Sequence, residues 1–263
     1  MKARKRFGQH FLEPAWVDKV VEAISPAPDE TFLEIGPGRG ALTLALARRA
    51  RAVLAVEIDR DLAPALAARV PSNVTIINAD FLAADLRALA PGGAPLRVAG
   101  NLPYNVSTPI LARLQAFADD GRRARDATVM LQLEVAARLT ASPGTKDWGV
   151  LAALQQLRAD IDVLLSLPPG AFRPAPKVRS AVVRLRYRPP RVTLAHPEVF
   201  DALVRAVFMH RRKMLSNALG PFGETRGLEG RLALERAGLD GRRRPETLDL
   251  GELARLSDVF ASA

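Results

Sequence analysis

Short apolar runs alternate with amphipathic stretches over the first two thirds of the chain. This alternation predicts a mostly parallel sheet whose strands are joined by crossover helices, so the expected fold class is α/β with a Rossmann-like sheet. The apolar runs predict seven strands, at residues 31–35, 52–56, 74–78, 96–99, 127–133, 161–165 and 181–187. The amphipathic stretches predict helices at residues 41–49, 62–69, 108–117, 134–140 and 150–158.

The strand pattern stops at Pro189-Pro190. Proline removes a backbone donor and restricts the residue before it, which disfavours a continued strand. Beyond this point, apolar residues over 199–208 recur at the spacing of one helix face. We therefore expect a first domain at residues 1–189 and a small helical domain at residues 190–263.

Charge points to a polyanionic partner. The chain has 263 residues and a formal net charge of +10, and lysine and arginine on a surface release counterions from nucleic acid. An arginine-rich and alanine-rich composition is also typical of GC-rich genomes, so the clustering of charge matters more than its total. The basic clusters lie at Arg4-Lys5-Arg6, Arg122-Arg123, Arg211-Arg212-Lys213 and Arg242-Arg243-Arg244.

Several classes of protein are disfavoured. The chain has no cysteine and three scattered histidines, which argues against disulfides, a thiolate nucleophile and a metal centre. No run approaches the roughly 18 apolar residues that cross a bilayer, and the amino terminus lacks an apolar signal core. We expect a cytoplasmic protein without a membrane segment.

A glycine-rich turn follows the first predicted strand. Gly36, Gly38 and Gly40 let a ligand press against the backbone where a side chain would collide. Ala41 stands where the dinucleotide fingerprint has its last glycine, which makes NAD the poorer interpretation. Glu57 comes 19 residues after Gly38, near the spacing of a carboxylate that binds ribose hydroxyls. The turn and this acid together favour a nucleoside.

Asp80 follows the third predicted strand. Three consecutive strands thus deliver Gly36, Glu57 and Asp80 to the carboxyl edge, where open α/β sheets bind ligands. Asp80 is suited to accept from an adenine amino group, with the backbone at Phe81 contacting the ring. Taken singly, each acid is equally compatible with a helix cap or a solvated surface position.

The tetrapeptide Asn101-Leu102-Pro103-Tyr104 ends the fourth predicted strand at the same edge. An exocyclic base amine attacks more readily when its two N–H groups donate hydrogen bonds to acceptors. Asn101 Oδ1 and the carbonyl of Leu102 or Pro103 can be these acceptors. Tyr104 offers a stacking face to an extruded base. The alternative is a loop with a core tyrosine. With a sulfonium donor no strong base is needed, so the pattern favours methyl transfer from S-adenosylmethionine to a base nitrogen.

Five segments together resemble one family. The sequences FGQHFL at 7–12, EIGPGRG at 34–40, NLPYN at 101–105, LPPGAFRPAPKVRSAVVRL at 167–185 and HRRKMLSNAL at 210–219 are similar to those of the small-subunit ribosomal RNA adenine dimethyltransferases. The resemblance implies a class I S-adenosylmethionine-dependent methyltransferase fold with a C-terminal helical domain. It also implies that two adjacent adenosines, in the loop of the 3′-terminal hairpin of small-subunit rRNA, become N6,N6-dimethyladenosine within an immature subunit.

The resemblance also assigns residues. The cofactor contacts that it carries over are His10, Leu12, Gly36, Glu57, Asp80 and Asn101, to which the turn adds Gly38 and the third strand end adds Phe81. Tyr104 and Phe172 become the faces that sandwich the flipped adenine, although a core role for Phe172 is the competing interpretation. The expected RNA contacts are Arg4, Lys5 and Arg6 in a basic arm at 1–12, with Lys177, Arg179, Arg211, Arg212 and Lys213.

Two positions depart from the family pattern. His10 stands where asparagine is frequent, which adds a possible pH dependence, and Leu133 stands where lysine is usual. Three other functions stay open: a large-subunit rRNA adenine methyltransferase of the macrolide-resistance type, a non-catalytic assembly or transcription factor, and a DNA adenine methyltransferase. We expect a monomer.

Overall fold

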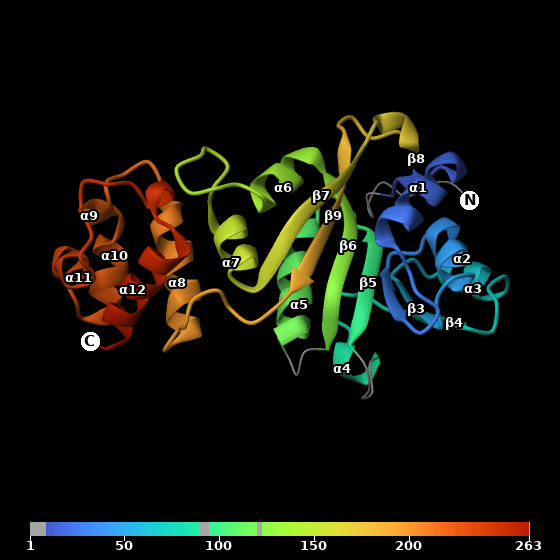
Figure 1. Cartoon of the computed structure of the whole chain (residues 1–263), viewed down its shortest axis with the longest axis horizontal. Helices are drawn as coiled ribbons and strands as arrows, with labels where there is room; N and C mark the ends of the chain where they lie inside the picture. The colour runs from blue at the N-terminus through green and yellow to red at the C-terminus, as the bar shows by residue number, and fades with distance from the viewer. Residues whose placement is uncertain (1–8, 90–94, 120–122, 263) are drawn as a thin grey trace. The chain divides into compact units, whose positions relative to one another are not determined.

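The computed structural model describes residues 9–89, 95–119 and 123–262, and the chain divides into two compact units (Figure 1). The first unit contains residues up to 136 together with 160–188, and the second contains residues 137–159 together with 189–263. The basic arm residues Arg4, Lys5 and Arg6, and Arg122, lie outside the described residues. Among the described residues, no helix combines the length and apolar character needed to cross a membrane.

The first unit is built on one seven-stranded sheet. Its strands run in the order β4-β3-β2-β5-β6-β9-β7, with bounds β2 Thr31–Ile35, β3 Ala52–Glu57, β4 Val74–Asn78, β5 Leu96–Asn101, β6 Ala124–Gln132, β7 Ala159–Leu167 and β9 Ser180–Tyr187. Strands β2 to β6 pair in parallel, and β9 runs antiparallel to β6. The predicted α/β class and seven-stranded sheet are confirmed.

Four of the six helices that the structure describes in the first unit lie close to predicted positions. The six are α1 Pro14–Ile24, α2 Ala41–Ala47, α3 Leu62–Ala67, α4 Leu86–Leu89, α5 Ser107–Asp119 and α6 Leu133–Leu139, the last of which crosses into the second unit. The four near predicted positions are α2, α3, α5 and α6. The sequence prediction missed α1, α4 and the two-residue strands β1 Phe11–Leu12 and β8 Phe172–Arg173. These two strands pair antiparallel over Phe11↔Arg173 and Leu12↔Phe172, a contact between distant segments that no local pattern announces.

Helix α1 has clear local causes. Pro14 occupies its first turn, where a missing N–H costs nothing, and Ser25 ends it in the left-handed conformation at φ 53°. Its buried face consists of Val17, Val20, Val21 and Ile24, and packs in one core with α2 and the inner face of the sheet. The helix therefore places residues 9–13, which precede it, beside the carboxyl edge of the sheet.

The second unit is helical. Its helices are α7 Val150–Arg158, α8 Pro197–Met209, α9 Leu215–Ala218, α10 Gly220–Arg226, α11 Gly230–Ala237 and α12 Leu250–Ala261. Helix α12 begins with a capping box, in which Asp249 accepts from Glu252 N and the Glu252 side chain accepts from Asp249 N. Left-handed Gly227 and Gly238 end α10 and α11.

The predicted division at residue 189 was incomplete. Residue 189 begins the second stretch of the helical unit, but residues 137–159, which we expected in the first domain, also belong to that unit. Helix α7 buries Ala152, Ala153 and Leu157 in one core with α8, and Trp148 donates from its indole to Leu248 O at 3.0 Å. From the sequence, α7 is indistinguishable from a crossover helix because it lies between two strands of the sheet.

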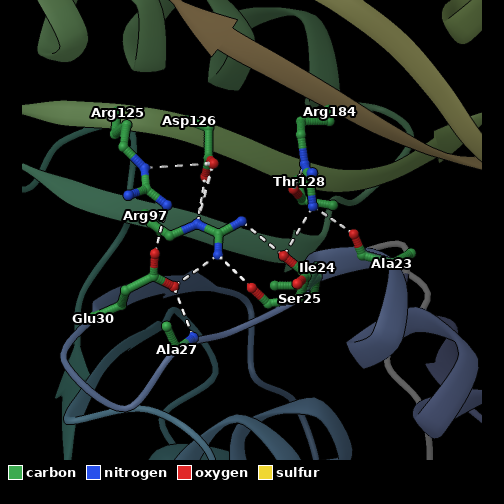
Figure 2. A network of polar contacts seen from close by, with 10 residues as sticks. All are labelled: Ala23, Ile24, Ser25, Ala27, Glu30, Arg97, Arg125, Asp126, Thr128 and Arg184. Atoms are coloured by element: carbon green, nitrogen blue, oxygen red, sulfur yellow. Dashed lines mark hydrogen bonds and ion pairs between the residues drawn. The ribbon is translucent and has the colours of Figure 1, made fainter.

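A buried guanidinium fastens the C-terminal end of α1 to the sheet (Figure 2). Arg97 on β5 is 4% exposed and bonds through Nε to Asp126 Oδ1 at 2.9 Å. Its Nη1 donates to Glu30 Oε2 at 2.7 Å and to Ser25 O at 2.8 Å, and its Nη2 donates to Ile24 O at 2.7 Å. Two carboxylates and two helix-end carbonyls therefore satisfy one buried cation.

A second arginine reinforces the same helix end. Arg184 on β9 donates to Ala23 O at 2.5 Å and to Ile24 O at 2.8 Å (Figure 2). The last carbonyls of a helix lack partners within the helix. Strands β5 and β9 together supply those partners, so the position of α1 is set by the sheet and not by the helix alone.

Candidate active site

The sheet order creates a crevice beside β2. The chain passes from β2 outward to β3 and β4, then returns to β5 on the other side of β2. Ligands bind outside the carboxyl ends of strands at such a reversal. Gly36 directly follows β2, and Glu57 and Asn101 end β3 and β5. The predicted delivery of these residues to one edge is confirmed.

The glycine turn lets two segments approach closely. Gly36 and Gly38 have φ of 67° and 57°, a region that glycine adopts without strain. A Cβ on Gly36 would lie 3.8 Å from Asn101 O, and one on Gly38 would lie 3.0 Å from the ring of Phe11. The Gly38 N–H donates to Glu57 Oε2 at 2.9 Å. Glu57 therefore holds the turn in place as well as facing the crevice.

A cavity of about 280 Å³ opens above the turn. Its wall includes four of the predicted positions at the sheet edge, Gly36, Gly38, Glu57 and Asn101, with Leu102, Pro103 and Tyr104. His10 and Leu12 close it from the other side. The structure thus brings together the predicted catalytic tetrapeptide and six of the eight predicted cofactor residues around one space.

A second cavity, of about 300 Å³, adjoins the first and contains the other two predicted cofactor residues, Asp80 and Phe81. The two cavities share Gly36, Ile58 and Pro103 in their walls. Ile58 is 43% exposed, an apolar side chain left open where both cavities meet. Sequence reasoning missed it because an isoleucine directly after a strand gives no local sign that it is exposed.

Asp80 has the capping role considered from the sequence and also lines a cavity. Its Oδ1 accepts from Leu82 N at 2.9 Å, which caps the short turn after β4. Its side chain is nonetheless exposed and lines the second cavity, where further lone pairs of the carboxylate can accept from an amine. A capping role and a ligand role are compatible at this position.

The Asn101 amide is oriented by the N-terminal segment. Its Nδ2 donates to His10 O at 2.5 Å, which assigns the nitrogen and leaves Oδ1 as an acceptor at the wall of the first cavity. The His10 ring bonds through Nδ1 to Pro174 O at 2.6 Å. His10 therefore spans from Asn101 to the loop after β8.

Tyr104 is held at its hydroxyl and covered on its ring. The hydroxyl lies 2.5 Å from Ser180 Oγ, and the ring stacks on His10 with centroids 5.3 Å apart and an interplanar angle of 24°. Burial raises the pKa of Tyr104, so its hydroxyl stays protonated. Pro103 O already accepts from Val106 N at 3.1 Å, which makes the carbonyl of Leu102 the freer second acceptor.

Phe172 does not present a stacking face in this structure. Its side chain is fully buried in the core of the first unit, and it lines neither cavity. Its backbone pairs with Leu12, so β1 lies beside it. The expectation that Phe172 sandwiches a base is wrong for this conformation, because the β1–β8 pairing places the ring in the core.

Two carboxyl groups lie buried at the floor of the site. Glu57 is 4% exposed, and burial raises its pKa. Hydrogen bonds from the Asp59 and Gly38 N–H groups lower the pKa and offset part of this shift. Glu34 on β2 is 1% exposed and lines the first cavity. Burial raises the pKa of Glu34 to about 8, and the charge of Glu57 acts in the same direction, while the Thr43 hydroxyl offsets part of the shift. Sequence reasoning missed Glu34 because a strand acid before the turn looked like an ordinary sheet residue.

We expect Glu34→Gln to change how stability depends on pH. A buried carboxyl with a raised pKa keeps its proton in the native state while the unfolded chain loses it, so the unfolding free energy falls as pH rises from about 4.5 to 8. The loss is at most about 5 kcal/mol. Urea denaturation at pH 5.5 and 8.5 should show this decline in the wild type and a smaller one in the variant. An equal decline in both proteins would contradict the assignment.

The basic side chains predicted to contact RNA differ in their exposure and in the bonds that they already make. Lys177 is exposed, and Arg179 is exposed and bonds to Ser166 Oγ at 3.0 Å. In the helical unit Arg212 and Lys213 are exposed, but Arg211 pairs with Glu246 at 3.0 Å and donates to Lys146 O at 2.7 Å. Arg211 thus stabilises its own unit, and the expectation of a phosphate contact is weakest there.

The family model described as "Ribosomal RNA adenine dimethylase" matches residues 1–256. The chain belongs to this family. Among its relatives, "Ribosomal RNA small subunit methyltransferase A" of Acinetobacter baylyi is 44% identical over 98% of this chain and 92% of its own length. The protein of the same description from Pelotomaculum thermopropionicum is 45% identical over 99% and 92%.

Solved structures agree with the fold. A dimethyladenosine transferase from Plasmodium falciparum matches with a TM-score of 0.72 at 22% identity, covering 94% of this chain and 96% of that one. The 23S rRNA methyltransferase ErmE matches with a TM-score of 0.69 at 29% identity, covering 95% and 99%. The class I methyltransferase sheet followed by C-terminal helices is therefore shown.

The residues of this adenine dimethylase fit the family's cofactor, S-adenosylmethionine. The molecule has an adenosyl part and a methionine part, and the site has two adjoining cavities. Asp80 and Phe81 line the second cavity, and Glu57 lines the first. His10, Leu12 and the glycine turn line the remaining space. Among the described residues, no group of three or more histidine or acidic side chains is arranged to hold a metal ion.

Proposed function

We propose that this chain dimethylates N6 of two adjacent adenosines in the loop of the 3′-terminal hairpin of small-subunit rRNA, within an immature subunit. One observation supports the proposed chemistry most directly. The His10 carbonyl accepts a hydrogen bond from the Asn101 amide nitrogen, so Oδ1 is left as an acceptor at the cofactor cavity. The family membership and the 41–49% identity to small-subunit methyltransferases support the choice of rRNA.

The chain's own groups act mainly by position. S-Adenosylmethionine supplies a methyl group on a positively charged sulfur. Asn101 Oδ1 and Leu102 O accept the N–H bonds of the target amine, which favours a pyramidal nitrogen whose lone pair points at the methyl carbon. When bound, the cofactor would donate this methyl group to the amine nitrogen positioned by Asn101 and Leu102, and the amine would then release one proton. Tyr104 supplies an aromatic face for the base once His10 yields that surface.

Two rival functions are less well supported. A large-subunit rRNA methyltransferase shares the fold, but the large-subunit enzyme ErmE is 29% identical, against 41–49% for the small-subunit relatives. A non-catalytic assembly factor has no need for an oriented Asn101 amide beside a two-part cavity. A cytoplasmic location and a monomeric state are part of the proposal.

Labelled S-adenosylmethionine tests the proposal. The protein is incubated with unmethylated small subunits, naked small-subunit rRNA or large subunits, and the labelled nucleotide is then mapped. We expect N6,N6-dimethyladenosine at two adjacent positions of the small-subunit rRNA. Label in large subunits alone would support the macrolide-resistance type, and no label on any substrate would support the non-catalytic factor.

We expect RNA affinity to fall steeply with salt. Four exposed cations, Lys177, Arg179, Arg212 and Lys213, predict a slope of log K against log salt of about −3. Replacing one of them with glutamine should make the slope shallower by about 0.7 to 0.9. Lys19→Gln on α1 serves as the control and should leave the slope unchanged. A flat salt response of the wild type would contradict the phosphate contacts.

A further inference from the structure

The His10 ring covers one face of Tyr104 in the first cavity. The two rings are stacked, with centroids 5.3 Å apart and an interplanar angle of 24°, and both residues line the cavity wall. A planar base that has left its own stack is held on an aromatic side chain by the same kind of contact. The imidazole therefore occupies a place on the tyrosine that suits a stacked base.

Tyr104 is fixed at the far end of its ring. Its hydroxyl lies 2.5 Å from Oγ of Ser180. Ser180 is fully buried on β9 and pairs with Gln132 of β6 in the sheet. A ring that is tethered to the sheet through its hydroxyl cannot swing away while this bond persists. Of the two stacked rings, the tyrosine is thus the one that stays in place.

His10 is held separately at its main chain and at its side chain. Its carbonyl accepts from Asn101 Nδ2 at 2.5 Å, whereas its ring donates from Nδ1 to Pro174 O at 2.6 Å. The ring bond lies at an exposed place, where water can supply new partners to both groups. Rotation about the Cα–Cβ bond of His10 leaves its carbonyl where it is. The imidazole can therefore leave Tyr104 without disturbing the Asn101 amide.

Two other aromatic rings near the site are committed to other contacts. Phe172 is fully buried in the core of the first unit. Phe11 lines the first cavity, but the Arg39 guanidinium lies 4.4 Å from the centroid of its ring, and the ring packs against the glycine turn at Gly38. Tyr104 is therefore better placed than either phenylalanine to exchange its present cover for a base.

We propose that the His10 imidazole is an internal substitute for the target base: it stacks on Tyr104 in the free protein, and the entering adenine displaces it. This deepens the proposed function and rests on it for the identity of the base. Displacement breaks the contact with Tyr104 and the bond to Pro174 O, so the base must stack better than an imidazole to be held. His10 thus competes with the RNA and sets a threshold for base entry.

Affinity for unmethylated small subunits tests this competition. It is measured without added cofactor, so that an effect of His10 on cofactor binding does not enter. His10→Asn removes the ring and keeps the carbonyl that binds Asn101. We expect this variant to bind the subunits up to about tenfold more tightly than the wild type, which corresponds to one aromatic pair. A merely structural role for His10 would weaken binding.

His196→Asn is the matched control. His196 is exposed at the start of α8 in the helical unit, and we expect its replacement to leave the affinity unchanged. A His10→Asn variant that binds no more tightly than the wild type overturns the inference and leaves the proposed function standing. If neither protein binds small subunits, the proposed function fails, and the inference fails with it.

Nuclear magnetic resonance locates the ring itself. The chain has three histidines, so selective labelling gives three ring signals, and His10→Asn identifies the one that is lost. The ring current of Tyr104 displaces the His10 signal in the free protein. The probe is the unmethylated 3′-terminal hairpin of small-subunit rRNA, and its binding should remove this displacement. A hairpin that binds while the His10 signal stays displaced overturns the inference. If the hairpin alone does not bind, the subunit measurement decides.

Discussion

Asn101→Ala lowers the rate of methyl transfer at saturating cofactor by about two to three orders of magnitude, while RNA binding stays close to wild type. The magnitude follows that of losing one positioned hydrogen-bond partner of a transition state. Alanine removes Oδ1, the acceptor that we propose for the target amine, and leaves the His10 carbonyl without its donor. Single-turnover methylation and filter binding of the same RNA measure the two effects separately.

Asn101→Asp is the matched comparison. It keeps an acceptor oxygen at the same position but loses the Nδ2 donor to His10 O, so we expect a smaller loss of rate than in Asn101→Ala. A near wild-type rate for the alanine variant would show that the Leu102 carbonyl alone suffices. A parallel loss of RNA binding would place Asn101 in substrate affinity and not in the chemical step.

Arg97→Met lowers the unfolding free energy by about 3 to 5 kcal/mol. Removing one partner of a buried ion network leaves Asp126 and the Glu30 carboxylate with less compensation, and frees the carbonyls of Ile24 and Ser25. Denaturant unfolding gives the free energy, and hydrogen exchange over α1 locates the loss. We expect faster exchange in α1 than in α5.

Arg125→Met provides the control for burial. Arg125 contacts the same Glu30 carboxylate at 2.5 Å but is 58% exposed, so its pair is screened by water. We expect a change within about 1 kcal/mol. Equal losses in the two variants would contradict the view that the buried guanidinium, and not the number of ion pairs, fastens α1.

The residues at the carboxyl edge of the sheet were predictable because local residue types mark where each strand ends. Gly36 follows an apolar run that turns, and Glu57 and Asp80 are the first acids after the next two runs. Parallel strands bring such positions together by topology alone. The resemblance added the identity of the RNA substrate, which spacing does not encode.

The prediction failed where contacts join distant segments. Phe172 and Leu12 are 160 positions apart and pair as two short strands, which moves the aromatic ring from the expected stacking position into the core. Helix α7 joined the helical unit for the same kind of reason, through Trp148 and Leu248. Neither contact can be read from the pattern of hydrophobic and polar residues in its own segment.

By itself, the sequence determined the α/β class, the strands of the sheet and the residues at its carboxyl edge, because hydrophobic period and turn residues are local properties. Only the tertiary structure decided to which unit α7 belongs and where the ring of Phe172 lies. It also decided how His10 orients Asn101, and that Glu34 is buried with an unmatched oxygen. Each of these depends on burial or on a partner far along the chain, and so on the folded packing of the whole unit.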